Sequence, residues 1–317
     1  MTKKARPSKR TARAEGQVGP RQSCPCGSGR RYKACHGGSD TSMPHVVRSF
    51  ESVPGECDWV AMREFVPAAR APVTLRPDAY DGDAKGRSVS AVTLLPGLTP
   101  ALVRDNSEIW LAAQVTHQSG DPSRDCAEAL RLALAATPGE SVVMGSLPGP
   151  GLRLQDVIEP DSDFVVEVLD GFDFWFDGVD DVDGRLGATL ESLNSSIDPT
   201  TRLESVHSAY WTSVGTKEHL RWVQPHDEEA MLTALARLHS AGADDLGPDS
   251  RLVGSFRAHG LLVPVWDLPV GLGPDALEVP AQTSAERLGD ALAVSRALSD
   301  DERAARNGLA NRQITIR

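Results

Sequence analysis

Four side chains that bind transition metals lie within thirteen residues near the start of this chain. They are Cys24, Cys26, Cys35 and His36, in the pattern Cys-x-Cys, eight residues, Cys-His. Zinc takes thiolate and imidazole ligands in tetrahedral geometry, and a closed set of three cysteines and one histidine is typical of a structural site. Ordinary thiols or a disulfide pair are the alternatives, because adjacent ligands are not the usual zinc-finger spacing. We expect these residues to bind Zn2+ in a small knuckle over residues 23–38.

The residues between the ligands suit a tight metal loop. Pro25 stiffens the link between the first two thiolates, and Gly27 and Gly29 allow the chain to turn back at once. Residues 30–34 contain neither glycine nor proline, so we expect one helical turn there that delivers the last two ligands. A glycine pair follows and would end that turn.

Residues 24–37, Cys-Pro-Cys-Gly-Ser-Gly-Arg-Arg-Tyr-Lys-Ala-Cys-His-Gly, resemble the SEC-C motif at the C-terminal tail of the SecA preprotein translocase ATPase. The ligands, the proline, the Gly-Ser-Gly and the Tyr-Lys all match. The resemblance implies that the two Cys-x-Cys thiolates, the third cysteine and the adjacent histidine are the zinc ligands. It also implies a module that contacts the SecB export chaperone or the ribosome. The chain has no Walker A sequence, so it is not the translocase motor itself.

Charge is divided unevenly along the chain. Residues 1–40 hold ten basic and two acidic side chains, a net charge of +8, and the whole chain carries −11, so residues 41–317 carry −19. A basic arm on an acidic body indicates that the arm meets an anionic partner such as RNA or a phospholipid surface, although a solvated tail is the alternative. The knuckle residues that we expect to contact a partner are Arg30, Arg31, Tyr32 and Lys33.

The N-terminal segment and the remaining cysteines bear on the compartment. Residues 1–22 are poor in large apolar side chains, so we expect them to be disordered, and no apolar stretch of a signal peptide follows. No run approaches the roughly eighteen apolar residues of a membrane-spanning helix. Cys57 and Cys126 are isolated, which indicates a reducing compartment, so we expect a cytoplasmic protein. Either thiol could be a nucleophile, but inert thiols are commoner.

The body, residues 46–317, contains four possible strand–strand–helix units, each with a tryptophan in its second strand. The predicted segments, in order, are 89–95, 109–115 and 123–136; 164–169, 172–177 and 186–193; 206–214, 219–223 and 227–240; and 252–258, 261–268 and 284–298. Short loops between paired strands favour hairpins. We expect an α+β fold with a largely antiparallel sheet and helices on one side. Whether the units are a true repeat stays open.

Helix-capping residues support some of these boundaries. Asp227 precedes an amphipathic segment, and Thr283 with Glu286 and Ser299 with Glu302 are possible capping boxes. Apolar residues at helical spacing predict a further helix over 58–69.

The sequence of the body contains no motif that identifies an active site. Residues 156–183 hold eleven acidic side chains and no basic one, but their register does not fit a calcium-binding loop. No metalloprotease, nucleophile-elbow or dinucleotide-binding motif is present. The histidines that could serve catalysis are His117, His207, His219 and His226. A concave pocket that brings two of them, or the acids of residues 170–183, within hydrogen-bond reach would favour an enzyme.

Three functions remain from the sequence. The first is a zinc-binding accessory protein whose knuckle and arm dock on an export chaperone, the translocation machinery or the ribosome. The second is an enzyme that carries the knuckle as a tag, and the third is an RNA-binding protein.

Overall fold

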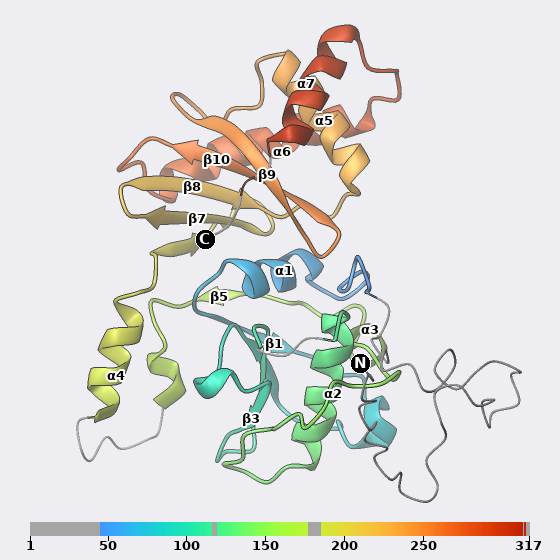
Figure 1. Ribbon diagram of the computed structural model, residues 1–317, viewed down its shortest axis with the longest axis vertical. Helices are drawn as coiled ribbons and strands as arrows, with labels where there is room; N and C mark the ends of the chain where they lie inside the picture. The colour runs from blue at the N-terminus through green and yellow to red at the C-terminus, as the bar shows by residue number, and fades with distance from the viewer. Residues whose placement is uncertain (1–44, 116–118, 177–184, 313, 315–317) are drawn as a thin grey trace, which may run out of the picture. The chain divides into compact units, whose positions relative to one another are not determined.

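The computed structural model describes residues 45–115, 119–176, 185–312 and 314. The described part is an α+β structure with two five-stranded sheets, one mixed and one antiparallel (Figure 1). The predicted fold class is therefore confirmed.

The first sheet has the strand order β3-β4-β2-β1-β5. Its strands are β1 (Ala69–Val73), β2 (Val89–Val92), β3 (Ala101–Val103), β4 (Ile109–Ala112) and β5 (Glu167–Val168). Strands β2 and β4 are parallel, and all the other neighbours are antiparallel. Helix α2 (Pro122–Ala135) begins with an N-cap at Asp121, whose side chain accepts a hydrogen bond from the Arg124 backbone N–H.

The second sheet is antiparallel throughout, in the order β6-β7-β8-β10-β9. Its strands are β6 (Thr200–Arg202), β7 (Ala209–Val214), β8 (Lys217–Trp222), β9 (Arg251–Ala258) and β10 (Leu261–Leu268). Strand β10 shows how the sheet is buried on both faces. Leu262 and Trp266 belong to the core shared with the C-terminal helices, whereas Val263 and Val265 belong to the core shared with α1. This alternation follows from the two-residue period of a strand.

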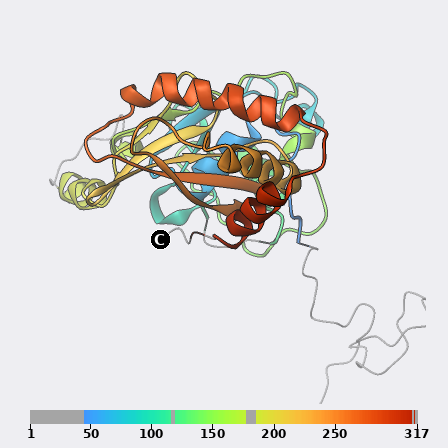
Figure 2. The same ribbon diagram turned by 90° about the horizontal axis from the view of Figure 1, so that it is seen from above.

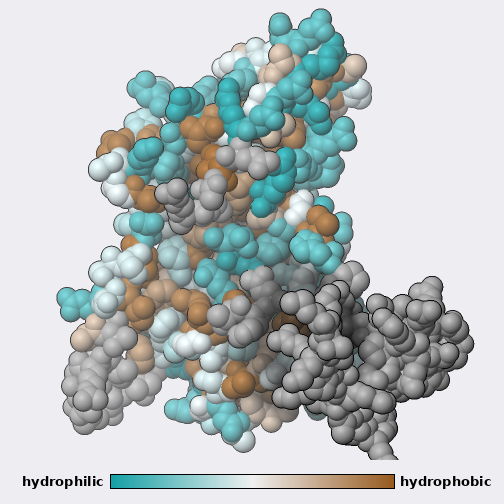
Figure 3. Space-filling model, viewed as in Figure 1, coloured by the Kyte–Doolittle hydropathy of each residue, from teal (hydrophilic) through white to brown (hydrophobic). Residues whose placement is uncertain are grey.

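Helices α5 (Glu228–Ser240), α6 (Glu278–Ala293) and α7 (Asp300–Asn311) all contribute to the core on one face of this sheet. Helix α5 lies between α6 and α7 (Figure 2). On the viewed face, the surface over α5 and α7 is mostly hydrophilic (Figure 3), as expected for helices with one apolar stripe.

Helix α1 (Glu56–Glu64) is buried along most of its length. Trp59 stacks between Phe50 and Phe164, with ring centroids 5.9 and 4.8 Å away. Just beyond the helix, Phe65 makes edge contacts with Tyr210 and Phe256 of the second sheet. Side chains of α1 and of both sheets therefore share one hydrophobic core.

The remaining short elements connect these layers. They are α3 (Leu154–Val157), α4 (Arg185–Asn194) and the 3-10 helices η2 (Ala79–Gly82), η3 (Pro96–Leu98), η4 (Asp173–Phe176) and η5 (Asp275–Leu277).

The last two predicted units are confirmed as hairpins followed by helices, and the first two need correction. Segments 89–95 and 109–115 are strands but pair in parallel, because β3 lies between them in sequence and takes the antiparallel place beside β4. Residues 172–176 of the predicted strand over 172–177 are not a strand. Residues Asp173–Phe176 form η4, and the Trp175 N–H bonds to the Phe172 carbonyl three residues earlier. Aromatic residues favour strands because their side chains pack well there, and a buried turn can offer the same packing.

The boundaries of two helices differ from the prediction. Helix α6 runs from Glu278 to Ala293 and not over the predicted 284–298, so Thr283 lies inside it and its hydroxyl bonds to the Val279 carbonyl instead of capping. The predicted helix over 58–69 is α1, which ends at Glu64, and residues from Ala69 onward form β1. The caps at Asp227 and Ser299 are confirmed.

A candidate binding cleft at the start of helix α1

The predicted metal ligands Cys24, Cys26, Cys35 and His36, and the predicted partner-binding residues Arg30, Arg31, Tyr32 and Lys33, lie outside the described residues. The donor set itself, three thiols and one imidazole, fits a closed tetrahedral zinc site. Within the described ranges, no three His, Cys, Asp or Glu side chains are grouped so that they could hold a metal ion. The structure therefore offers no competing site there.

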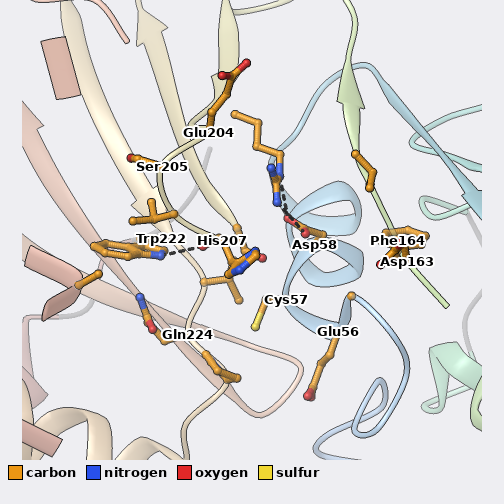
Figure 4. Close-up of a pocket in the computed structure, with 18 of the residues that line it drawn as sticks. Glu56, Cys57, Asp58, Asp163, Phe164, Glu204, Ser205, His207, Trp222 and Gln224 are labelled. Carbon is orange, nitrogen blue, oxygen red and sulfur yellow. Dashed lines mark hydrogen bonds and ion pairs between the residues drawn. The ribbon is translucent and has the colours of Figure 1, made fainter. Parts of the chain in front are cut away.

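A cleft of about 800 Å³ opens beside the first turn of α1 (Figure 4). Its walls come from the start of α1, the segment before β5, the β6–β7 loop and the segment after β8. The lining residues are Gly55–Asp58, Ser162–Val165, Arg202, Glu204–Ser208, Trp222–His226 and Ala285. This size lies within the range of small-molecule sites, which is about 300–1,000 Å³.

The buried carboxylate of Asp58 joins α1 to the second sheet. Its Oδ1 accepts a 2.6 Å hydrogen bond from the Tyr210 hydroxyl, and both of its oxygens lie 3.4 Å from nitrogens of Arg202. Burial, followed by the Asp58 charge, raises the pKa of Tyr210 well above its usual value, so the phenol is a hydrogen-bond donor. The carboxylate is thus neutralised by groups of the opposite wall.

A second link crosses the cleft on the other side. Arg48 binds both carboxylate oxygens of Glu56, at 2.6 and 2.8 Å, and donates to the Pro225 carbonyl at 2.9 Å. A bidentate pair fixes the guanidinium geometrically. Glu56 is therefore also neutralised, and the loop after β8 is tied to the first turn of α1.

The two loops of the second sheet are themselves held in place. The Glu278 carboxylate at the start of α6 accepts hydrogen bonds from the backbone N–H groups of Glu204 and Ser205, at 2.9 and 2.8 Å. The Trp222 indole N–H donates to the His207 carbonyl at 2.9 Å. Because these contacts hold the backbone, the cleft is largely preformed.

The thiol of Cys57 lines the cleft but is poorly suited to attack. Burial, and then the charges of Glu56 and Asp58, raise its pKa to about 12. Since the thiolate is the nucleophile, this cysteine is protonated at neutral pH. The fully buried Cys126 has its pKa raised to about 11 by burial. Neither thiol has the lowered pKa that nucleophilic catalysis requires.

Two of the four histidines singled out in the sequence line the cleft. His207 is exposed and His226 half-buried, and within the described residues neither imidazole is hydrogen-bonded to the other or to a carboxylate. His219 instead lies 3.0 Å from Asp267 on the second sheet, and His117 is outside the described residues. The structure brings two histidines to one pocket without assembling an acid–base pair.

The acidic stretch is only partly at this site. Asp163 lines the cleft, whereas Asp173 accepts a hydrogen bond from Asn194 and serves a structural role. The acids of residues 177–183 lie outside the described residues.

Sequence patterns did not single out Gln224, Trp222 or Asp58 as cleft residues. The one sequence signal for Asp58 was its charge, since the residues that follow it at the start of the predicted helix over 58–69 are apolar. No sequence pattern marks Gln224, because it lies in the short connection between a strand and the N-cap of α5.

Comparison with known protein families decides the assignment of the body. The family of unknown function DUF5926 matches residues 49–317, which include every residue of the cleft. The chain belongs to the DUF5926 family. A SEC-C motif matches residues 21–38 and confirms the resemblance drawn from the sequence. No curated protein and no solved structure matches the chain. In the described part of this DUF5926 protein, no helix is both long and apolar enough to cross a bilayer.

Proposed function

We propose that this protein is a zinc-binding adapter of the cytoplasm. A SEC-C knuckle over residues 23–38, with the basic arm of residues 1–22, docks on an export chaperone, the translocation machinery or the ribosome. The DUF5926 body over residues 46–317 is carried with it. The observation that carries the proposal is the SEC-C motif with its complete set of zinc ligands.

Zinc supplies the folding free energy of the knuckle, on the order of 10 kcal/mol in comparable modules. Cys24, Cys26, Cys35 and His36 would hold the ion, and the basic side chains between them would face the partner. The compartment follows from the same chemistry, because zinc-bound thiolates and the two free cysteines of the body suit a reducing environment.

The test is a crosslinking pull-down from native lysate with zinc content measured in each sample. Intact protein is compared with the Cys24→Ser/Cys26→Ser variant and with a Cys57→Ser control, which changes a cysteine of the body. We expect the double variant to lose both zinc and its ribosomal or export partners, and the control to keep both. Loss of zinc with unchanged partners would overturn the adapter proposal.

An RNA partner would appear in the same experiment as capture that nuclease abolishes. Its affinity should fall steeply with salt, because phosphate contacts release counterions.

A second candidate function is small-molecule binding or turnover by the body, with the knuckle as a localisation tag. The cleft at the start of α1 favours it, since it has the size of a ligand site and preformed walls. A thermal-shift screen of intact protein against a metabolite panel tests this, and absence of any shift counts against it.

A further inference from the structure

The cleft at the start of α1 contains a polar side chain that is buried but has no partner. Gln224 is 7 % exposed and lies with Trp222 on the wall that follows β8 (Figure 4). In the described part of the chain, its amide makes no hydrogen bond, although it can donate two and accept two. The polar atoms of this amide are not among the fully buried atoms without a partner, so they face water in the open cleft. A ligand that enters the cleft can therefore replace that water as the hydrogen-bond partner of Gln224.

The ionised groups of the cleft favour a positive ligand. Two of its carboxylates are already neutralised, Glu56 by Arg48 and Asp58 by Arg202 and Tyr210. The other two, Asp163 and Glu204, are exposed and form no ion pair with any described residue. Apart from the Cys57 thiol and the imidazoles of His207 and His226, the ionisable lining groups without an opposite partner are therefore carboxylates.

The start of α1 does not reverse this preference. A helix N-terminus attracts anions through its unpaired backbone N–H groups. Here, however, the first turn already carries the two acidic side chains Glu56 and Asp58. An incoming anion would also meet Asp163 and Glu204 at the opening, so the local field disfavours phosphates and carboxylates.

Apolar side chains supply the rest of the cleft surface. They are Phe164, Val165, Val206, Trp222, Val223 and Pro225. Such walls bind the hydrocarbon or aromatic part of a ligand, while a few polar groups set its orientation.

We propose that this cleft binds a small organic cation, an amine or guanidine attached to an apolar or aromatic body. The amide of Gln224 accepts a hydrogen bond from the ligand, and Asp163 and Glu204 attract its charge. The proposal concerns the body and stands independently of the zinc-dependent docking proposed above.

The test uses three probes with the same indole ring and different charge. They are tryptamine (positive), 3-ethylindole (neutral) and indole-3-propionate (negative), titrated calorimetrically into intact, zinc-loaded protein at low salt. We expect tryptamine to bind most tightly and indole-3-propionate least, and the preference to shrink at 0.5 M salt through screening. Equal or tighter binding of the anion, or no saturable binding of tryptamine, would overturn the proposal.

Variants locate the site and separate its two contributions. Gln224→Leu should weaken tryptamine binding about tenfold by removing a hydrogen bond to a charged group. Asp163→Asn/Glu204→Gln should weaken tryptamine several-fold and leave 3-ethylindole unchanged. Because both acids are exposed and unpaired among the described residues, this double variant keeps its fold even if Gln224→Leu does not. Glu191→Gln on α4, which changes charge away from the cleft, is the matched control. If the double variant binds tryptamine like the control, the site is not this cleft and the proposal fails.

Discussion

The hydroxyl of Tyr210 on β7 lies 2.6 Å from Oδ1 of Asp58 on α1, although the two residues are 152 positions apart in the chain. Both side chains are buried, at 0 % and 4 % exposed. Their hydrogen bond ties the N-terminal helix to the second sheet at the edge of the cleft.

Tyr210→Phe should destabilise the body, because it removes a donor from a buried carboxylate. Hydrogen bonds to charged groups contribute about 1.5–3 kcal/mol. Urea unfolding followed by circular dichroism measures the change. Tyr80→Phe is the control, since the Tyr80 hydroxyl donates to the neutral carbonyl of Ala127 and should cost only about 1 kcal/mol. Equal losses in the two variants would mean that the Asp58 charge is not stabilised by Tyr210.

Gly55→Ala should destabilise the body more than Gly86→Ala. The two glycines have nearly the same backbone, with φ of 71° and 73°. A Cβ at Gly55 would lie 2.4 Å from the Phe164 ring, whereas a Cβ at Gly86 meets nothing within 4 Å. Both variants therefore carry the left-handed cost of about 1–2 kcal/mol, and Gly55→Ala adds about 1–3 kcal/mol of overpacking. Unfolding midpoints in urea give the comparison, and indistinguishable midpoints would show that Phe164 moves away freely.

Cys57 should alkylate slowly, with a rate that rises about tenfold per pH unit from pH 7 to 9.5 without a plateau. The reason is its pKa of about 12, since only the thiolate reacts. Iodoacetamide labelling followed by peptide mass spectrometry separates Cys57 from the knuckle cysteines. Glu56→Gln removes a charge that raises this pKa, so labelling at pH 8 should accelerate. A plateau below pH 9 would contradict the buried, acid-flanked environment.

The ionised side chain of Glu302 should stabilise α7 at neutral pH, and this stabilisation should be lost at strongly acidic pH. Hydrogen bonds from Arg296 and then from the Ser299 backbone N–H lower its pKa from 4.5 to about 2. A folded-state pKa below the unfolded value gives stability that is complete above about pH 4.5 and is lost as the pH falls toward 2. The stability advantage of the native chain over Glu302→Gln should therefore shrink across that window in urea unfolding.

A neighbouring acid provides the comparison for this window. Asp301→Asn changes an exposed first-turn acid of α7 outside the capping box. The loss of stability caused by Asp301→Asn should be smaller than that caused by Glu302→Gln, and it should vary less between pH 5 and 3. A pH-independent difference for Glu302→Gln would exclude the ionised capping box as its cause.

Local chemistry made part of the fold predictable. The Asp227 and Ser299 caps were visible because capping depends on a side chain and the backbone two or three residues later. The β9–β10 hairpin was visible because its strands are joined by a two-residue turn at His259 and Gly260. Segment 172–177 was mistaken for a strand because its aromatic residues satisfy either a strand or a buried 3-10 turn, and only the packing of Trp175 against Phe172 distinguishes them.

The sequence by itself determined the SEC-C motif, since its three cysteines and one histidine lie within thirteen residues. The cleft was decided only by the tertiary structure. Asp58, Arg202, Tyr210 and Gln224 come from separate elements, and no local pattern relates them. They meet because α1 packs its apolar residues against the second sheet, and hydrophobic burial sets that contact without regard to which polar side chains it brings together.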